Sequence, residues 1–463
     1  MSFILTVLAA ILLTAANYYG SLYFLSWFAF LPFFYYLYIY SSEINYKKIF
    51  LSGWNLGFWI LFFSGNFIYH SIKLYTSAPT LIILLLMILL FLLLSLIYAL
   101  FLLFYFYLQQ KLFTQNKFRP FLFACCWTLL EFSRYYLLGF FPIANPAYTQ
   151  ADFLSFIQLA ELGGVWILTF VLILVNALIF QLVFQKKHKN IFVLSLILII
   201  SFSFSYFLQQ KNFAAERVET FKIGIITTQI EQEKKWSSAQ LDKNIDLALN
   251  AAAELNQTQL IIAPETNLTF DFHLNRYYQQ QFLDEVAKKF ETPIQIGSLA
   301  AKDSIGGRYN SSYLISEKGE IISRYDKNLL LYFGEIYPLS EILNKYTPYN
   351  FSSLKPGEDI NLFKNRNLQW KTVICSEILY PDYVKLEAEE IDFIVNQTNE
   401  AWFKDSRLLK NIMWQAAVFR AVENRIPVVK TGNQAYNGII YASGEYQKVD
   451  STVNYHILKS NKE

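Results

Sequence analysis

The sequence predicts a bundle of transmembrane helices followed by an α/β domain, and three observations lead to this fold class. The 463-residue chain is 54% hydrophobic, 18% aromatic and only 16% charged, which is too apolar for an ordinary soluble protein. Nearly all of its long apolar runs come before Gln210. The rest of the chain alternates polar and apolar residues, as the strands and helices of a globular domain do.

The first half contains seven segments that are long and apolar enough to cross a bilayer, which takes about 20 residues of helix. They are residues 2–18, 22–40, 49–72, 79–108, 120–140, 163–185 and 190–208. The first segment has no basic start and no small-residue cleavage site, so we expect it to be retained. We therefore predict a transmembrane domain of about seven helices over residues 1–210.

Positive charge is concentrated in alternate connections between these segments. The connections after the second, fourth and sixth segments contain Lys47 and Lys48, then Lys111, Lys117 and Arg119, then Lys186, Lys187 and Lys189. The opposite connections contain little besides Lys73. Because positively charged loops stay in the cytoplasm, we expect a cytoplasmic N-terminus. An odd number of crossings then places the soluble domain in the periplasm or outside the cell.

The second half, residues 218–455, reads as strands alternating with helices. A mixed sheet covered by helices is therefore expected. Helical periodicity marks residues 241–252, 277–290 and 407–424, and Glu317-Lys318-Gly319 predicts a hairpin turn. Strand patterns cover residues 221–230, 259–266, 292–300, 309–316, 320–327, 372–377, 392–398 and 427–434.

Three residues capable of chemistry follow three of these strands: Glu265, Lys327 and Cys375. The ligand crevice of an α/β sheet lies beyond the carboxyl ends of its strands, so these side chains can meet there. A thiolate is the nucleophilic form of cysteine, a buried carboxylate can accept the thiol proton, and an ammonium can stabilise an oxyanion. Together they predict acyl transfer through a thioester. Taken alone, Cys375 is better explained as a buried structural cysteine, and Glu265 or Lys327 as a solvated charge, so the prediction depends on the three residues together.

Several motifs carry a resemblance to a known family. The stretches "APET" (263–266), "YDKNLLLYFGEIYPL" (325–339) and "ICSEILYPD" (374–382) resemble the Glu, Lys and Cys motifs of the nitrilase superfamily of carbon-nitrogen hydrolases. The additional stretches are similar to apolipoprotein N-acyltransferases, the membrane-bound branch of that superfamily. They are "NEAWF" (399–403), "LSWFAFLPFF" (25–34), "WTLLEFSRYYLLGFFP" (127–142) and "ELGGVWILTF" (161–170).

The resemblance implies an αββα sandwich for the soluble domain and a location in the bacterial inner membrane. It also implies an enzyme that takes an acyl chain from a membrane phospholipid, holds it as a thioester and passes it to the N-terminal diacylglyceryl-cysteine of a lipoprotein. Glu265 is then the base, Lys327 the oxyanion and thiolate stabiliser and Cys375 the nucleophile. Glu335, Glu377 and Trp236 match further residues of the family's site. No cofactor is implied.

The chain departs from the family pattern at three places. Ser376 follows the nucleophile where the family has a large aromatic residue, and Ile143 replaces the tryptophan of a Phe-Pro-Trp loop. The family commonly carries one more membrane helix after the catalytic domain, whereas "VNYHILKSNKE" (453–463) is too short and polar to span a bilayer. The first two departures, at Ser376 and Ile143, affect the positioning of substrate rather than the chemistry, because neither side chain supplies a proton or a nucleophile.

Two other functions stay open on the residues alone. One is a membrane-tethered amidase or nitrilase-like hydrolase that uses water as acceptor, and the other is a non-enzymatic lipid-binding protein with an inert Cys375. The four histidines are scattered and form no pair at metal-ligand spacing, so we expect no metal. The net charge of +3 comes from the cytoplasmic loops and indicates no nucleic acid partner.

Three further features are left open. The apolar stretches 266–278 and 328–340 are either mobile arms or ordinary packed loops. Glu131 and Arg134 are three residues apart in one predicted helix, where they can pair with each other, contact a substrate headgroup, or extend their charged groups to the membrane surface.

Overall fold

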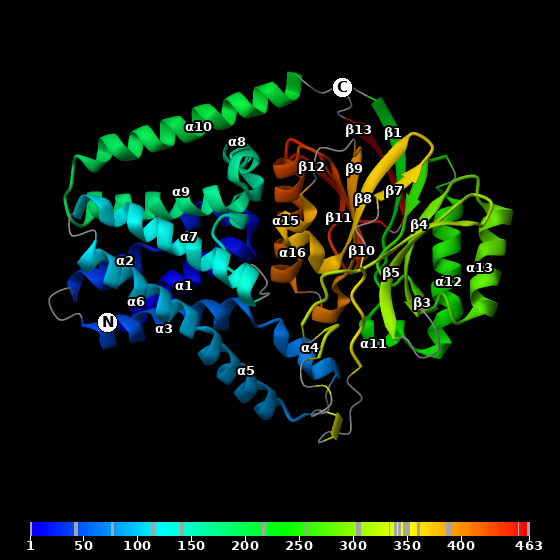
Figure 1. The fold of residues 1–463 in the computed structure, drawn as a ribbon, viewed down its shortest axis with the longest axis horizontal. Helices are drawn as coiled ribbons and strands as arrows, with labels where there is room; N and C mark the ends of the chain where they lie inside the picture. The colour runs from blue at the N-terminus through cyan, green and yellow to red at the C-terminus, as the bar shows by residue number, and fades with distance from the viewer. Residues whose placement is uncertain are drawn as a thin grey trace. The chain divides into compact units, whose positions relative to one another are not determined.

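The computed structural model divides the chain into two compact units, which we describe separately (Figure 1). The helical unit comprises Met1–Lys211 with Arg407–Gln415, and the sheet unit comprises Asn212–Ser406 with Ala416–Glu463. The structure describes residues 2–460 except 41–44, 76–77, 113–115, 139–142, 215–218, 256, 302–306, 333, 338–339, 341–343, 346–351, 359–361, 386–390, 405 and 452.

Each of the seven predicted membrane segments contains helix. The elements are α1 (Ser2–Tyr18), η1 (Gly20–Trp27), α2 (Leu31–Ile39), α3 (Tyr46–Ser64), α4 (Ile68–Tyr75), α5 (Thr80–Leu94), α6 (Leu96–Lys111), η2 (Asn116–Phe118), α7 (Arg119–Leu138), η3 (Tyr148–Asp152), α8 (Leu154–Ile157), α9 (Ala160–Val183) and α10 (Asn190–Ala214). Among the described residues, four stretches have the length and hydropathy of a membrane span: Gly20–Ile39, Thr80–Lys111, Ala160–Val183 and Asn190–Gln210. The number of crossings stays a prediction.

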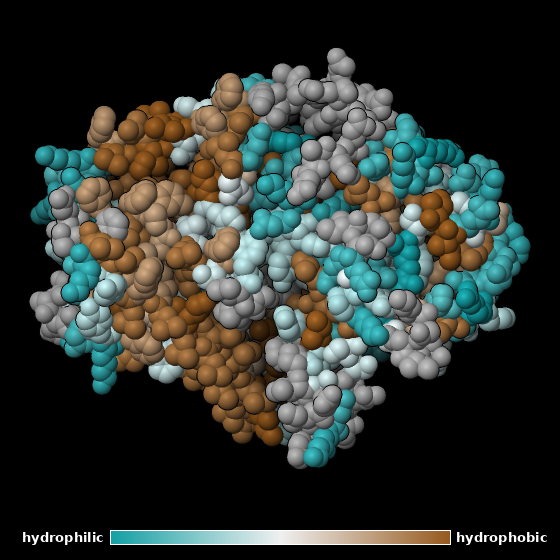
Figure 2. Space-filling model, in the orientation of Figure 1, coloured by the Kyte–Doolittle hydropathy of each residue, from teal (hydrophilic) through white to brown (hydrophobic). Residues whose placement is uncertain are grey.

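Close helix packing and buried polar contacts hold the helical unit together. A Cβ atom at Gly53 of α3 would lie 2.6 Å from the carbonyl oxygen of Tyr98 on α6, so only glycine allows this approach. Trp54 of α3 donates its indole N–H to the Leu92 carbonyl of α5 at 2.7 Å. The surface of this unit is largely hydrophobic in Figure 2, as a surface facing lipid requires.

The predicted pairing of Glu131 with Arg134 is confirmed. Both side chains are buried on α7, and Arg134 Nη1 donates to the two carboxylate oxygens of Glu131 at 3.0 and 2.9 Å. Arg134 Nη2 donates to the carbonyl of Ile143 at 3.0 Å. The pair therefore neutralises itself inside the unit and fixes the chain at Ile143, while Pro142 lies outside the described residues.

The sheet unit contains a seven-stranded and a six-stranded sheet. The first has the order β13-β1-β2-β4-β5-β6 with β3 beside β4, and the second has the order β12-β11-β10-β9-β8-β7. The strands are β1 (Glu219–Ile226), β2 (Leu260–Ile262), β3 (Leu268–Asp271), β4 (Ile294–Ala301), β5 (Arg308–Ile315), β6 (Ile321–Asp326), β7 (Leu362–Asn365), β8 (Leu368–Ile374), β9 (Phe393–Asn399), β10 (Val428–Asn433), β11 (Asn437–Ile440), β12 (Tyr446–Val449) and β13 (Val453–Ser460).

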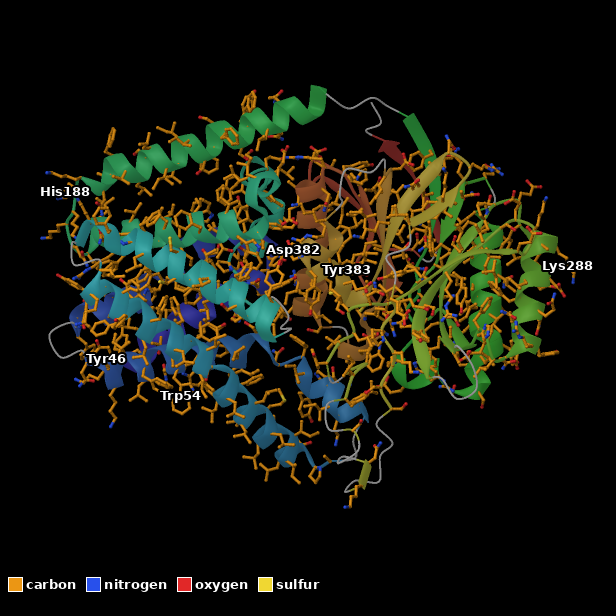
Figure 3. All side chains as sticks on the ribbon, viewed as in Figure 1. Tyr46, Trp54, His188, Lys288, Asp382 and Tyr383 are labelled. Carbon is orange, nitrogen blue, oxygen red and sulfur yellow. The ribbon has the colours of Figure 1, made fainter. Side chains whose placement is uncertain are left out.

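Helices flank these sheets, so the predicted fold class of apolar helices followed by an α/β domain is confirmed. The helices and 3-10 turns are α11 (Gln232–Lys235), α12 (Ser238–Ala253), α13 (Arg276–Lys289), η4 (Cys375–Leu379), α15 (Pro381–Val384), η5 (Glu400–Phe403) and α16 (Arg407–Asn424). Lys288 of α13 points outward, consistent with a helix whose other face covers a sheet (Figure 3).

Alternation along the short strand β2 shows the layers. Ile261 packs in the cluster formed with Ile245 of α12 and Phe282 of α13. Leu260 and Ile262 point the opposite way, into the cluster that contains Trp370 and other residues of the second sheet. The sheets therefore pack face to face, with α12 and α13 on the outer face of the first sheet (Figure 1).

Polar contacts between the sheets fix their relative position near the end of β2. Gln295 of β4 donates to Thr372 Oγ1 of β8 at 2.9 Å and accepts from the indole of Trp370 at 2.8 Å. Gln397 of β9 donates to the carbonyl of Ala263 at 2.6 Å. These buried contacts hold the chain two residues before Glu265 against the second sheet.

Candidate active site

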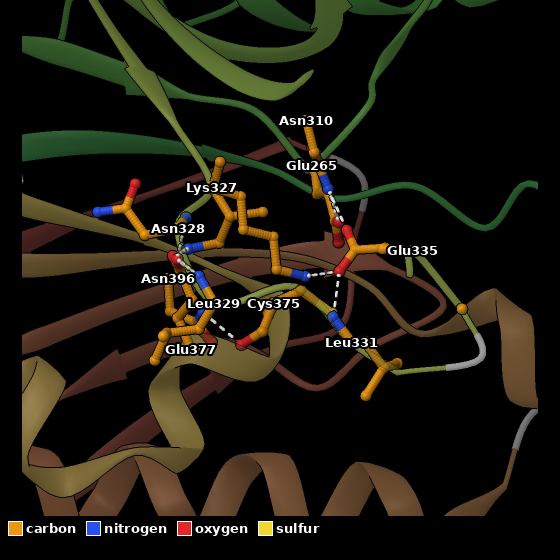
Figure 4. Close-up of polar contacts among 12 residues, drawn as sticks. Glu265, Asn310, Lys327, Asn328, Leu329, Leu331, Glu335, Cys375, Glu377 and Asn396 are labelled. Atoms are coloured by element: carbon orange, nitrogen blue, oxygen red, sulfur yellow. Dashed lines mark hydrogen bonds and ion pairs between the residues drawn. The ribbon is translucent and has the colours of Figure 1, made fainter. Parts of the chain in front are cut away.

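Glu265, Lys327 and Cys375 come together at one edge of the sandwich (Figure 4). They follow β2, β6 and β8 respectively. The charges of Glu265 and Lys327 both act on the Cys375 thiol, which places the three groups within electrostatic range of one another. Glu265 and Lys327 are buried, and Cys375 is half-buried. The convergence predicted from the strand ends is therefore present.

Cys375 occupies a sharp turn between β8 and η4. Its φ of +53° lies in the left-handed region, which a residue with a side chain adopts at a cost of about 1–3 kcal/mol. The Asn396 side chain donates to the carbonyl of Cys375 at 3.3 Å and helps to hold this conformation (Figure 4). The turn ends the strand abruptly and presents the side chain at the edge of the sheet.

Glu377 connects this turn to the loop that follows Lys327. Its carboxylate accepts hydrogen bonds from the backbone N–H groups of Ile374, Asn328 and Leu329 at 2.7, 2.8 and 3.0 Å. It also accepts from the Tyr325 hydroxyl, which is hydrogen-bonded in turn to the Tyr383 hydroxyl at 2.5 Å. Burial raises the pKa of Glu377. With its oxygens engaged by these donors, Glu377 acts on the site by positioning its neighbours.

A chain of polar contacts joins Lys327 to Glu265 (Figure 4). Lys327 Nζ forms an ion pair with Glu335 at 2.5 Å, and the Asn310 amide donates to Glu335 at 2.9 Å and to Glu265 Oε1 at 2.6 Å. Glu335 also accepts from the N–H of Leu331 at 2.9 Å. Among the described residues, Glu265 Oε2 is buried and accepts no hydrogen bond. One oxygen of Glu265 is therefore held and the other is available to accept a proton.

Burial and neighbouring charges set the protonation states of the site. Burial raises the pKa of Glu265, opposed by the charge of Lys327. Burial also raises the pKa of the Cys375 thiol, and the charge of Glu265 adds to this rise while Lys327 opposes it. Burial alone would lower the pKa of Lys327, but nearby acidic groups, Glu335 above all, outweigh it and hold that pKa above its usual value. The resting site thus combines a neutral thiol with a charged lysine.

The remaining predicted residues lie at different depths. Ser376 is buried in η4, directly after Cys375. Trp236 is 40% exposed and lines an open pocket of about 570 Å³ together with Leu241, Phe270 and Arg276. The first apolar stretch left open by the sequence forms β3, with Leu268 and Phe272 fully buried, so this part is packed rather than free. In the second stretch, Tyr332 is 54% exposed.

Two residues of the site were missed in the sequence. Asn310 lies near the start of β5, which runs antiparallel to its neighbours, so its N-terminal end reaches the same edge as the carboxyl ends of β4 and β6. Lys235 is buried, yet its sequence context "EQEKKW" reads as a solvated charged turn. A search for polar residues at the beginnings of antiparallel strands would have found Asn310.

Comparisons with known proteins match both units. The model of the apolipoprotein N-acyltransferase N-terminal domain matches residues 9–178, and the carbon-nitrogen hydrolase model matches residues 223–452. Among solved structures, an amidase from Nesterenkonia sp. aligns with 52% of this chain and 91% of its own, at 16% identity and a TM-score of 0.39.

Three curated relatives are named apolipoprotein N-acyltransferase. The protein of Geobacter metallireducens is 29% identical over 70% of this chain and 64% of its own length. That of Haemophilus influenzae is 29% identical over 73% of this chain and 68% of its own, and that of Rickettsia prowazekii is 25% identical over 72% and 68%. The chain therefore spans about two thirds of the length of these curated relatives.

Proposed function

The chain belongs to the apolipoprotein N-acyltransferase family and is a bacterial membrane protein, and from this premise we propose that it N-acylates lipoproteins. The acyl donor is a membrane phospholipid, and the acceptor is the α-amino group of the diacylglyceryl-cysteine at the lipoprotein N-terminus. Relatives that carry this name in three genera support the reaction class. The membrane helices support a donor that resides in the bilayer.

The observation that carries the proposal is the Glu265 carboxylate, which has one oxygen without a hydrogen bond among the described residues and whose charge acts on the Cys375 thiol. In the first half-reaction, Glu265 Oε2 accepts the thiol proton as sulfur attacks the ester carbonyl of the phospholipid. Lys327 stabilises the resulting oxyanion, an interaction worth about 3–4 kcal/mol at comparable sites. The intermediate collapses to a Cys375 thioester, and Glu265 returns the proton to the departing lysophospholipid oxygen.

The second half-reaction uses the same groups. The neutral α-amine of the acceptor attacks the thioester, Glu265 accepts the amine proton, and Lys327 again stabilises the oxyanion. The carbon–sulfur bond then breaks, an amide forms, and the proton returns to the Cys375 sulfur. A thiol that is neutral at rest fits this scheme, because a base that holds the proton only during attack makes a permanent thiolate unnecessary.

Supporting residues have distinct roles in this proposal. Glu335 holds the ammonium of Lys327 by an ion pair, and Glu377 holds the turn that presents Cys375. Trp236 contacts substrate from its exposed position in the pocket. Ser376, which is smaller than the family's aromatic residue, leaves more room beside the nucleophile.

The proposed orientation follows from the charged loops. The N-terminus is cytoplasmic, the chain crosses the inner membrane several times, and the sheet unit faces the periplasm. Lys47, Lys111 and Lys187 are representative of the loops that favour this orientation. Cysteine labelling of single loop positions in intact cells tests it.

An assay that distinguishes transfer to a lipoprotein-like peptide from transfer to water tests the reaction. The purified full chain in phospholipid vesicles with a labelled acyl chain is given a diacylglyceryl-cysteinyl peptide, and lipid products are followed by mass. We expect a triacylated peptide and a lysophospholipid in equal amounts, and neither product with Cys375→Ser. Free fatty acid without triacylated peptide would contradict the transfer reaction and favour a hydrolase. No release of acyl chain would favour a lipid-binding protein.

A further inference from the structure

A second buried lysine lies beside the base of the site. Lys235, at the end of α11, is only 1% exposed. Its Nζ donates to Thr266 Oγ1 at 2.9 Å and to the backbone carbonyl of Glu265 at 3.3 Å. Lysine is rarely buried this completely unless an anion pairs with it. Both of these acceptors are uncharged, so the burial of the Lys235 ammonium needs another explanation.

The charges around Lys235 supply that explanation. Glu265 and Cys375 are the titratable groups whose charges act on its ammonium. Lys327 and Glu335 act on Glu265 as well, and the thiol also experiences Lys327, Glu335 and Glu400. Lys235 therefore adds a second positive charge, after Lys327, to a site where the charges of several carboxylates act on a thiol. Both positive charges favour the ionised forms of Glu265 and Cys375.

The hydrogen bonds from Lys235 also hold the backbone of the turn at Glu265 and Thr266. Thr266 has a φ of +46°, an unusual conformation for a β-branched residue. On one side, Gly297 of β4 donates its N–H to the Pro264 carbonyl at 3.2 Å. On the other side, Lys235 holds the Glu265 carbonyl and the Thr266 hydroxyl. The backbone of Lys235 is fixed in turn by Asn244 of α12, whose amide donates to its carbonyl at 3.1 Å.

We propose that Lys235 is a positioning residue for the base: it fixes the Glu265–Thr266 turn and supplies a positive charge that keeps the Glu265 carboxylate ionised beside the thiol. This inference rests on the proposed acyl transfer for its role in the reaction. The charge effect itself is independent of the acyl donor. Burial lowers the pKa of Lys235 to about 8, opposed by the charges of Glu265 and Cys375, so the ammonium is the main form at neutral pH.

Two pH profiles of the full chain in detergent test the inference. The first is the rate of Cys375 alkylation by iodoacetamide, and the second is the rate of thioester formation from phospholipid. Lys235→Met removes the charge and keeps the length of the side chain. Removing a positive charge raises the pKa of both Glu265 and the thiol, so we expect both profiles to move about one pH unit higher. Thioester formation at pH 7 then falls about tenfold.

Lys234→Met is the matched control, because Lys234 belongs to the same helix but is 69% exposed and pairs with Glu231. We expect its profiles to equal those of the wild type. Lys235→Arg retains the charge and should restore the wild-type midpoint of alkylation. If the rates of Lys235→Met fall but the midpoints of its pH profiles do not shift, Lys235 has a structural role only, and that result overturns the inference.

Thr266→Val covers the case in which Lys235→Met does not fold. It removes only the hydroxyl that accepts from Lys235, and we expect a smaller shift in the same direction. Unchanged profiles for Thr266→Val and an unfolded Lys235→Met would together overturn the inference. A wild-type protein that forms no thioester would contradict the proposed function. The alkylation profiles would still test the role of Lys235, because alkylation of Cys375 needs no acyl donor.

Discussion

Replacing Gly297 with alanine should displace the base, Glu265, without changing the chemical identity of any catalytic side chain. Gly297 lies on β4, beside the segment that carries Glu265. An added Cβ would lie 2.5 Å from the backbone nitrogen of Thr266, 2.7 Å from the Pro264 carbonyl and 2.8 Å from Glu265 Cα. Ordinary contacts begin near 3.4 Å, so these atoms must move by about 0.6–0.9 Å.

A displacement of this size is large for a catalytic group. A misplacement of about 1 Å can cost about 100-fold in rate, so we expect Gly297→Ala to slow thioester formation by about that factor. The change also overpacks the core, at a cost of about 1–3 kcal/mol in the free energy of unfolding. The assay is single-turnover thioester formation with excess labelled phospholipid, quenched in acid and read as the mass of the intact chain.

Gly224→Ala is the matched control, since it makes the same chemical change in β1 of the same sheet. The three atoms nearest to its added Cβ all belong to Leu255, with Cδ1 at 2.9 Å and Cβ at 3.0 Å, and none belongs to a residue of the site. We expect a similar loss of stability and a rate within about twofold of the wild type. Equal rates for Gly297→Ala and the wild type would refute the argument that β4 sets the position of Glu265.

Three further predictions follow from the buried charges. Glu265→Gln should lower the rate of thioester formation at least about 100-fold. The wild-type rate should also fall as the pH drops through the raised pKa of Glu265, because only the ionised carboxylate accepts the thiol proton. A wild-type rate that is independent of pH between 5 and 8, together with an unchanged rate in the variant, would argue against Glu265 as the base. Glu377→Gln places an amide nitrogen among backbone donors such as the N–H of Ile374 and leaves at least one donor unsatisfied, so the free energy of unfolding should fall by about 1–3 kcal/mol. An unchanged melting temperature would contradict the positioning role of Glu377. Arg134→Met leaves Glu131 buried without a cation and should destabilise the helical unit in detergent by about 3–5 kcal/mol. Changing both residues to leucine should cause a much smaller loss of stability, and equal losses would show that the two residues are not coupled.

Strong local patterns made much of the fold predictable. Runs such as residues 221–230 and 427–434 combine β-branched residues with turn signals, and they form β1 and β10. Gly319, with its φ of +74°, confirms the hairpin between β5 and β6. β13 was missed because "VNYHILKS" is a mixed polar and apolar sequence whose pairing partner, β1, lies more than 200 residues away. Long-range pairing of this kind leaves little local signal.

The site was only partly predictable for a related reason. Strand ends correctly indicated where Glu265, Lys327 and Cys375 would meet, because that inference needs only the direction of parallel strands. Asn310 required knowledge of an antiparallel neighbour, which sequence periodicity does not reveal. Lys235 required knowledge of burial, and a lysine beside another lysine gives the opposite expectation. The contacts that tune the carboxylate are tertiary in origin and become visible only in the folded chain.

The most direct test of the account is the mass of the peptide that contains Cys375 after brief exposure of the full chain to phospholipid vesicles. The account predicts a fatty-acyl increment on Cys375 that hydroxylamine removes and that is absent when either Glu265→Gln or Lys327→Met is introduced. An unmodified Cys375, or an acyl group that persists on it in both variants, would contradict the claim that these three residues act as one site.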